Sequence, residues 1–404
     1  MDRIEVIVRA SSLHDKRQSA RLKKRLLSEI SAAGPVALEE VPAASEKRLT
    51  AILLLTGGVE REVLKLASQL PSPTLLIAHP GHNSLSASLE VLARIRQDGG
   101  EGEILFGPPE VIAAGLLQEL RVVSAWEALR FSRVGMIGPP SDWLIASDVD
   151  RAFLKGQLGI HLVEMETEEL LKRIDSAAST KREVARFTKG AVGAPEVQSA
   201  RLEGAVSIYT ALRALVEEHR LAACTVRCFD LVTRLQNTGC YALSRLNDEG
   251  IPAGCEGDLQ AFFSLYIGFL LSGQVGFMGN ITSVVPPEHR VQMAHCSCPL
   301  SLAGGYVIQS HFESGCGLGI GAKISQGPCT IFRLGGKRLD RLFIRQGEVE
   351  EATPRDDLCR TQVEVSCTEP VDSLLTAPLG NHHVLLLGHH REAIERFFRR
   401  FLAT

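Results

Sequence analysis

Residues 51–78 read AILLLTGGVEREVLKLASQLPSPTLLIA, and this stretch decides the fold class of the first third of the chain. An apolar run ends in Thr56-Gly57-Gly58, a helical pattern follows over 59–70, and a second apolar run occupies 74–78. Short apolar runs that alternate with helical patterns predict β-α-β units and a parallel sheet. The flanking sequence continues this alternation, with an expected strand at 4–8 and expected helices at 22–30 and 85–95.

A second alternating set begins near Arg133 and predicts another α/β domain. Its expected strands include 159–163 and 222–226, and its expected helices are 168–174, 194–219, 229–236 and 241–246.

From Pro286 onward the sequence changes to short β-branched or aromatic runs separated by Gly and Pro, with one terminal helical pattern at 391–401. This texture is typical of antiparallel strands. We therefore predict two parallel-sheet α/β domains, at 1–132 and 133–285, followed by a mainly antiparallel β domain at 286–404. The expected strands of the last domain are 306–310, 330–334, 342–345, 361–366 and 383–387.

The composition of the chain excludes several classes of protein and of binding partner. The 404 residues are 45% hydrophobic and 23% charged, and 44 Lys and Arg against 47 Asp and Glu leave a net charge of −3. This balance excludes a disordered, collagenous or coiled-coil protein and offers no strong field for nucleic acid or anionic lipid. The charged residues near Met1 do not form a secretory signal, so we expect a cytoplasmic protein that binds a small molecule. The uncharged run 261–278 is interrupted by polar residues, which favours a buried core helix over a membrane span.

All ten cysteines lie from Cys224 onward, and none forms a paired CxxC motif of the kind that structural zinc sites use. In a chain expected to be cytoplasmic, we interpret them as reduced thiols, most of them small buried hydrophobes.

Two carboxylates precede the uncharged run, and both are candidate catalytic residues. Glu256 and Asp258 stand where a buried helix begins, a position that favours a negative charge. If both residues were helical, their side chains would point roughly 200° apart, so both could not face one metal ion. We therefore expect one to be chemical and the other structural.

Histidines concentrate after these carboxylates. Seven of the twelve lie in the last 116 residues, which points to a site where the second and third predicted domains meet. His382 and His383 open an expected strand, where neighbouring side chains point to opposite faces, so only one can enter a given pocket. Four alternating glycines at Gly315–Gly321 precede a strand pattern instead of a helix, which argues against a dinucleotide loop and favours a strand with one bare face.

Several motifs together resemble the L-fucose isomerase-like family. They occur in collinear order over most of the chain, although no one of them is specific alone. The motifs are Leu55-Thr56-Gly57-Gly58-Val59-Glu60, Asn83-Ser84, Ser141-Asp142-Trp143-Leu144-Ile145-Ala146-Ser147, Gly254-Cys255-Glu256-Gly257-Asp258, Gly276-Phe277-Met278-Gly279-Asn280, His295-Cys296, His311-Phe312-Glu313-Ser314-Gly315, Leu358-Cys359-Arg360-Thr361-Gln362 and Pro378-Leu379-Gly380-Asn381-His382-His383.

The resemblance implies a homo-oligomeric aldose–ketose isomerase that binds a divalent cation, typically Mn²⁺, and converts a sugar or sugar derivative through an enediol. It implies Glu256 as metal ligand and proton shuttle, position 280 as a second metal-binding carboxylate, and His382 as the third ligand. This chain has Asn280 there, which keeps an oxygen ligand but loses a charge. Expected substrate-binding residues are His295, His311, Arg360, Gln362, Asn381 and His383.

Asn280 leaves two alternatives open. One is another metal-assisted enolisation, by an epimerase or a lyase. The other is a sugar-binding paralogue without turnover.

Overall fold

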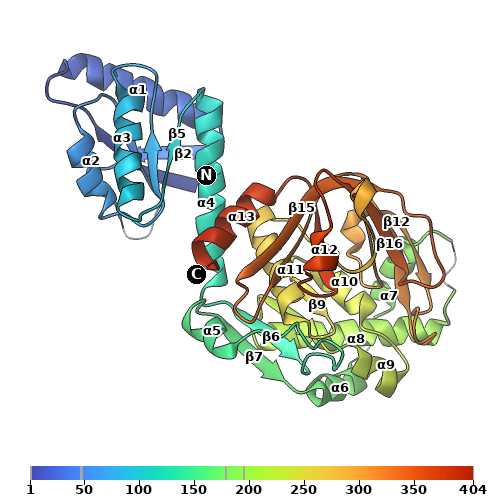
Figure 1. Ribbon diagram of the computed structural model, residues 1–404. Coiled ribbons are helices and arrows are strands. Elements are labelled where there is room, and N and C mark those ends of the chain that lie inside the picture. Colours follow the sequence, from blue (N-terminus) through green and yellow to red (C-terminus); the bar gives the residue numbers. More distant parts are fainter. Residues whose placement is uncertain (1, 46–48, 178–179, 194–195, 404) are drawn as a thin grey trace. The chain divides into compact units, whose positions relative to one another are not determined.

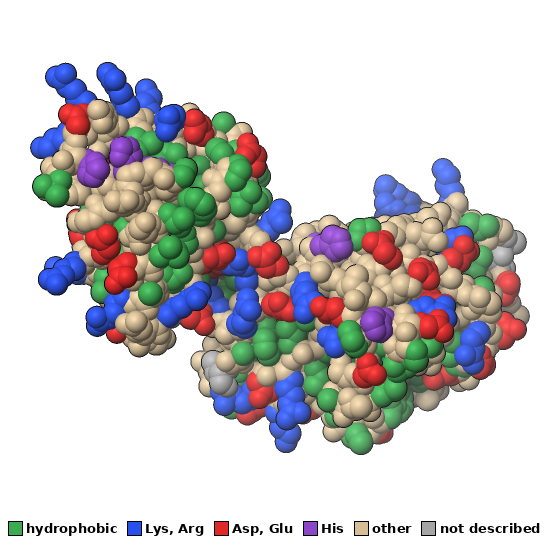
Figure 2. All heavy atoms as spheres, turned by 45° about the horizontal axis from the view of Figure 1, so that its top comes forward, with side chains coloured by type: hydrophobic (Ala, Val, Ile, Leu, Met, Phe, Trp, Pro, Cys, Tyr) green, Lys and Arg blue, Asp and Glu red, His purple; other side chains and the backbone are tan. Residues whose placement is uncertain are grey.

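The computed structural model describes residues 2–45, 49–177, 180–193 and 196–403 (Figure 1). The chain forms two compact units, Met1–Ser124 and Ala125–Thr404. Acidic and basic side chains are both spread over the face in Figure 2, in keeping with a net charge near zero.

The first unit is built on a parallel sheet with strand order β2-β1-β3-β4-β5. Neighbouring residues of β3 belong to different cores: Leu53 packs with α1 and α4, whereas Ile52 and Leu54 pack with α2 and α3. Helices therefore cover both faces, as expected for β-α-β units. The elements are β1 (Asp2–Arg9), α1 (Lys16–Ala32), β2 (Val36–Glu40), β3 (Thr50–Leu54), α2 (Glu60–Ala67), β4 (Thr74–Ile77), α3 (Ser84–Gln97), β5 (Gly102–Leu105) and α4 (Pro109–Leu129), which continues into the second unit.

The second unit begins with a four-stranded parallel sheet of order β7-β6-β8-β9. The long helix expected at 194–219 is α8, and residues 194 and 195 lie outside the described residues. The elements are β6 (Arg133–Ile137), α5 (Arg151–Gly156), β7 (His161–Met165), α6 (Thr167–Ser176), α7 (Lys181–Lys189), α8 (Ser199–Glu218), β8 (Ala223–Val226), α9 (Phe229–Leu235), α10 (Cys240–Asp248), β9 (Ala253–Cys255) and α11 (Leu259–Ser272).

The C-terminal part is a closed antiparallel barrel of order β10-β11-β16-β15-β14-β17, with a separate two-stranded sheet of β12 and β13. The predicted parallel-sheet α/β parts and antiparallel β part are thus confirmed. Strand β10 precedes residue 286, where we expected the β domain to begin. The elements are β10 (Phe277–Val285), β11 (Arg290–His295), β12 (Ala303–Gln309), β13 (Gly319–Ile324), β14 (Gly327–Gly335), β15 (Arg341–Glu350), β16 (Thr361–Cys367), α12 (Ser373–Thr376), β17 (His382–Leu387) and α13 (Arg391–Phe401), with single 3₁₀ turns at Pro286–Glu288 and Leu300–Leu302.

Helix α11 is the uncharged run of the sequence, and its residues from Leu259 to Gly268 are all buried. It packs so closely on the barrel that a Cβ at Gly268 would lie 2.9 Å from Phe332 Cζ. No helix among the described residues is long and apolar enough to cross a membrane. Helix α11 follows β9 of the second parallel sheet and packs on β14 and β17 of the barrel, so its N-terminus lies between these two parts.

The alternating glycines form one strand only in part, which corrects our expectation. Gly315 and Gly317 lie in a turn with φ of +61° and +55°, and only Gly319 and Gly321 belong to β13. A Cβ at Gly317 would also lie 2.8 Å from the backbone of Asn237. The first two glycines therefore serve a left-handed, tightly packed turn.

Candidate active site

Glu256 occupies a strained turn between β9 and α11. Its φ is +61° and that of Gly257 is +72°, so two successive residues are left-handed. The carbonyl of Glu256 accepts a hydrogen bond of 2.9 Å from Ser141 N, and a Cβ at Gly257 would lie 2.8 Å from Pro140 Cα. Strained backbone of this kind concentrates at functional sites, where the surrounding structure holds it in place.

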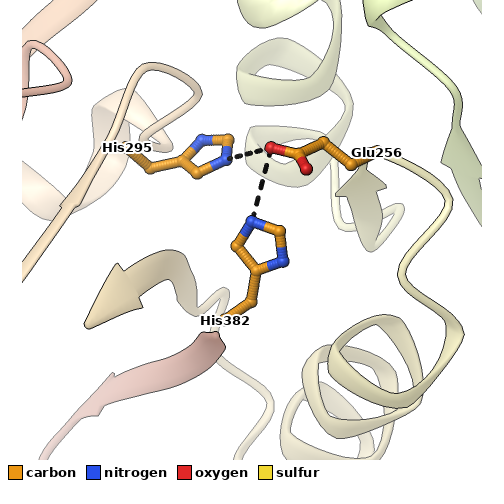
Figure 3. A group of neighbouring side chains, drawn as sticks. All are labelled: Glu256, His295 and His382. Atoms are coloured by element: carbon orange, nitrogen blue, oxygen red, sulfur yellow. Dashed lines mark ion pairs between the residues drawn. The ribbon is translucent and has the colours of Figure 1, made fainter. Parts of the chain in front are cut away.

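Three side chains from different elements meet at this turn (Figure 3). Glu256 Oε1 lies 3.5 Å from His382 Nε2, at the start of β17, and 3.9 Å from His295 Nε2, at the end of β11. At most 9% of each side chain is exposed. Among the described residues, these three form the one group of His, Cys, Asp or Glu whose ligand atoms lie mutually within 4.8 Å.

The group fits a divalent cation. Carboxylate oxygen and imidazole nitrogen bind metals at about 2.0–2.2 Å, so two ligands of one ion lie roughly 3–4 Å apart. Both measured separations from Glu256 fall in this range. His382 Nε2 is buried and has no hydrogen-bond partner, although it faces the carboxylate. A buried nitrogen without a hydrogen-bond partner needs another interaction, and a lone pair that faces a carboxylate at this distance suits a shared cation.

The electrostatics keep Glu256 charged. Burial acts to raise its pKa, but His382, His295 and the indole of Trp143 together lower the pKa to about 2. Trp143 Nε1 donates to Glu256 Oε2 at 2.6 Å, which leaves Oε1 facing the histidines. Burial lowers the pKa of His295 to about 3, and its Nδ1 lies 2.8 Å from Ser297 Oγ. Glu256 is therefore an ionised carboxylate beside the neutral imidazole of His295.

Asp258 lies behind this group. Its Oδ1 accepts the Ala261 amide at 2.8 Å and caps α11, which confirms a carboxylate at the helix N-terminus. Its Oδ2 lies 3.0 Å from His382 Nδ1 and 3.1 Å from Arg333 Nη1. Burial acts against its charge, but Arg333 and His382 lower the pKa of Asp258 to about 2. Burial alone would lower the pKa of His382, whereas Asp258 and Glu256 raise it to about 9.

The two adjacent histidines point to opposite sides, as strand geometry predicts. His382 faces Glu256 and Asp258, whereas His383 packs edge-on against the Phe343 ring at 5.1 Å. Burial lowers the pKa of His383 to about 3. Its Nδ1 lies 3.4 Å from the Asn381 carbonyl.

Asn280 and Asn381 bind each other. Asn381 Nδ2 donates to Asn280 Oδ1 at 2.9 Å, while Asn280 lies opposite His382 in the ladder of β10 and β17. The amide oxygen of Asn280 thus accepts one hydrogen bond and keeps a second lone pair. Among His, Cys, Asp and Glu side chains, His295 is the third member of the group with Glu256 and His382.

The remaining expected substrate residues lie near β13 and β16. His311 precedes β13, Arg360 directly precedes β16, and Gln362 belongs to β16. His311 is 7% exposed and bonds to Ser314 Oγ at 3.0 Å, and burial together with Arg360 lowers its pKa against the opposing effect of Glu256. Arg360 Nε donates to the Ser310 carbonyl at 2.9 Å. Gln362 bonds to the backbone of Arg355, and Arg360 and Gln362 both line a separate pocket of about 280 Å³. Among the described residues, neither side chain has a hydrogen bond or ion pair to Glu256.

Two residues near this group, Trp143 and Arg333, were not predicted from the sequence as site residues. Trp143 lies in one of the family-like motifs, but nothing in the sequence predicts its bond to Glu256. Arg333 lies in the apolar run of β14 with no exposed surface, and a charged residue within such a run is the signal that indicates a buried partner.

Comparisons with known proteins point to sugar isomerases. No protein-family model matches the chain. Sulfoquinovose isomerase from Clostridium sp. (strain MSTE9) is 25% identical over 333 residues, which cover 77% of this chain and 73% of that protein. The same enzyme from Priestia aryabhattai is 24% identical and covers 76% and 71%. That from Alkalicoccus urumqiensis is 23% identical and covers 72% and 68%. These similarities support the prediction that the chain is an enzyme of the isomerase class.

Proposed function

We propose that this protein is a metal-dependent aldose–ketose isomerase that acts on a sugar or sugar derivative through an enediol. The observation that carries the proposal is the buried group of Glu256, His295 and His382, whose ligand atoms converge. The similarity to sulfoquinovose isomerases supports the reaction class.

Glu256, His295 and His382 would hold the cation. We propose Mn²⁺ because the resemblance to the L-fucose isomerase-like family implies it and a carboxylate suits it, while the two imidazoles would also accept other divalent transition metals. When bound, the cation polarises the sugar oxygens and makes the neighbouring carbon-bound proton more acidic. We assign the other residues of the expected set, including Asn280, to the surroundings of the sugar.

Glu256 moves the proton in this mechanism. Its carboxylate removes the proton from C2 of the aldose, the electron pair of that bond forms the C1–C2 double bond of the enediol, and the carbonyl oxygen takes up a proton. Reprotonation at C1 and loss of the O2 proton then give the ketose. Trp143 orients the carboxylate through its bond to Oε2.

For the substrate, we propose a hexose that carries an anionic group, with sulfoquinovose as the first candidate because the similar proteins bear that name. The test incubates the purified full-length protein and Mn²⁺ with sulfoquinovose, L-fucose and a panel of other aldoses in D₂O. Ketose formation, followed by NMR and accompanied by deuterium at C1 or by internal transfer, is the expected result.

Two other outcomes decide against this reaction. Deuterium exchange at C2 with a new epimer or a cleaved product would indicate another enolisation. Sugar binding without turnover on the whole panel, with Mn²⁺ bound, would indicate the paralogue without catalysis. Glu256→Gln serves as the control for contaminating isomerases.

A further inference from the structure

We propose that Asp258 and Arg333 are positioning residues that fix the ring orientation and the tautomer of His382, so that its Nε2 lone pair faces Glu256. The inference rests on the proposed function in one respect, because it assumes that His382 Nε2 binds the cation.

The contacts hold His382 at both ends. Asp258 Oδ2 lies 3.0 Å from Nδ1 of the ring, and Arg333 Nη1 donates to the backbone carbonyl of His382 at 2.6 Å. The same Nη1 lies 3.1 Å from Asp258 Oδ2. One guanidinium nitrogen therefore links the carboxylate that binds the ring to the backbone that carries it.

Arg333 is itself held rigidly. Its Nη2 donates to Ser147 Oγ at 3.0 Å and to Gln260 Oε1 at 3.3 Å. At Gly380 the backbone φ is +152°, and any side chain there would collide with the guanidinium. This fork of donors is specific to arginine and could not be reproduced by lysine.

Stability alone does not explain this pair. Neither Asp258 nor Arg333 has exposed side-chain surface, and the desolvation of two buried charges offsets much of their attraction. A buried ion pair is therefore weak evidence for stabilisation. It does fix geometry, because each acceptor atom of Asp258 has a defined donor.

The contact at Nδ1 leaves Nε2 as the nitrogen of His382 that can bind a cation. A histidine whose Nδ1–H donates to a carboxylate has its second nitrogen free as a ligand, and such partners commonly orient metal-binding histidines. Nε2 of His382 lies 3.5 Å from Glu256 Oε1 and has no other partner. His295 differs, because its Nδ1 meets only the neutral hydroxyl of Ser297.

The main test variant is Asp258→Asn. If the asparagine keeps its oxygen on the Ala261 amide, its NH₂ group faces both His382 Nδ1 and Arg333 Nη1. It then loses the bond from Arg333 and imposes the opposite tautomer on His382, with the proton on Nε2. Two measurements on the full-length protein follow: Mn²⁺ affinity by titration calorimetry, and the side-chain ¹⁵N shifts of His382 in the metal-free protein, assigned with His382→Ala and recorded above the His382 pKa of about 9, where the ring is neutral.

We expect Asp258→Asn to weaken Mn²⁺ binding about 10–100-fold and to move the His382 proton to Nε2. Arg333→Lys should weaken binding less while keeping the charge, and it replaces Asp258→Asn if that variant does not fold. The matched control is Glu183→Gln, which breaks another partly buried ion pair of the same unit, 2.9 Å from Arg245, without touching the site. It should lower the Tm and leave Mn²⁺ affinity unchanged.

An unchanged Mn²⁺ affinity in both Asp258→Asn and Arg333→Lys would overturn the positioning role. The outcome is separable from the proposed function. Absence of turnover by the wild-type protein would contradict the isomerase, whereas the ¹⁵N shifts of the metal-free protein report the tautomer whether or not the protein turns over a sugar.

Discussion

Two buried ionic networks of the second unit differ in how completely they are satisfied. In the helical network, Glu183 accepts from Arg245 and the Tyr241 hydroxyl, and Glu249 binds Arg245 and Tyr209. In the network at the start of α11, His382 Nε2 is buried without a partner. The first network links α7, α8 and α10, and both of its carboxylates have donors. In the second network, His382 Nε2 is left available as a ligand atom. An unsatisfied nitrogen that faces a carboxylate at ligand distance, as His382 Nε2 does, distinguishes this network from the helical one.

The largest expected effect is that of Glu256→Gln. The amide removes the general base and one ligand charge, so we expect turnover to fall by at least about 10²–10⁴-fold. The comparison variant Glu183→Gln should keep turnover and lose about 1–3 kcal/mol of stability, because a partly buried bond to Arg245 is broken. The measurements are kcat on the active sugar and thermal unfolding. A normal kcat for Glu256→Gln would show that neither network has a catalytic role.

The adjacent histidines give the next effect. His382→Ala removes a ligand atom, so bound Mn²⁺ after dialysis should fall sharply. His383→Ala should leave the metal content nearly unchanged and cost stability, because it leaves a cavity beside Phe343. The amount of Mn²⁺ bound to each purified variant tests this prediction. Equal metal loss in both would mean that the opposite orientation of the two rings does not govern binding.

Gly257→Ala should produce an intermediate effect. The site network depends on a left-handed turn, and a methyl group there meets Pro140 and a φ of +72°. We expect Glu256 to shift, with roughly tenfold weaker Mn²⁺ binding and a lower Tm. Gly250→Ala is the matched control, since its φ is +76° but its Cβ would meet only Phe269 at 3.6 Å. If both variants bind Mn²⁺ like the wild type, the strained turn does not set the ligand position.

Local patterns in the sequence predicted what is local in the structure. The order β3-α2-β4, a carboxylate at the N-terminus of α11 and the opposite faces of His382 and His383 all follow from periodicity and position, although which carboxylate forms the cap does not. The edge strand β2 was missed because only Val36 of its five residues is fully buried, which leaves little apolar pattern.

The site was predicted less completely because its contacts are long-range. His295 reaches Glu256 because β11 pairs with β10 in the closed barrel. Arg333 reaches Asp258 across 75 residues of sequence. Barrel closure of this kind has no signature in spacing, so the sequence did not indicate that His295 lies with Glu256 and His382, and Asn280 stays a predicted ligand.

The smallest expected effect is that of Asn280→Asp. Asn280 lies opposite His382 in the β10–β17 ladder, and its oxygen already accepts from Asn381 Nδ2, a bond that an aspartate would keep. The variant thus adds a negative charge near the site without removing a contact. Because Asn280 is partly exposed, solvent screens this charge, and we expect Mn²⁺ binding to tighten by less than about tenfold. Asn280→Ala, which removes the oxygen, should leave the affinity almost unchanged. If instead Asn280→Ala weakens binding as strongly as His382→Ala, the Asn280 oxygen is itself a ligand, and the group of three in the structure is one member short.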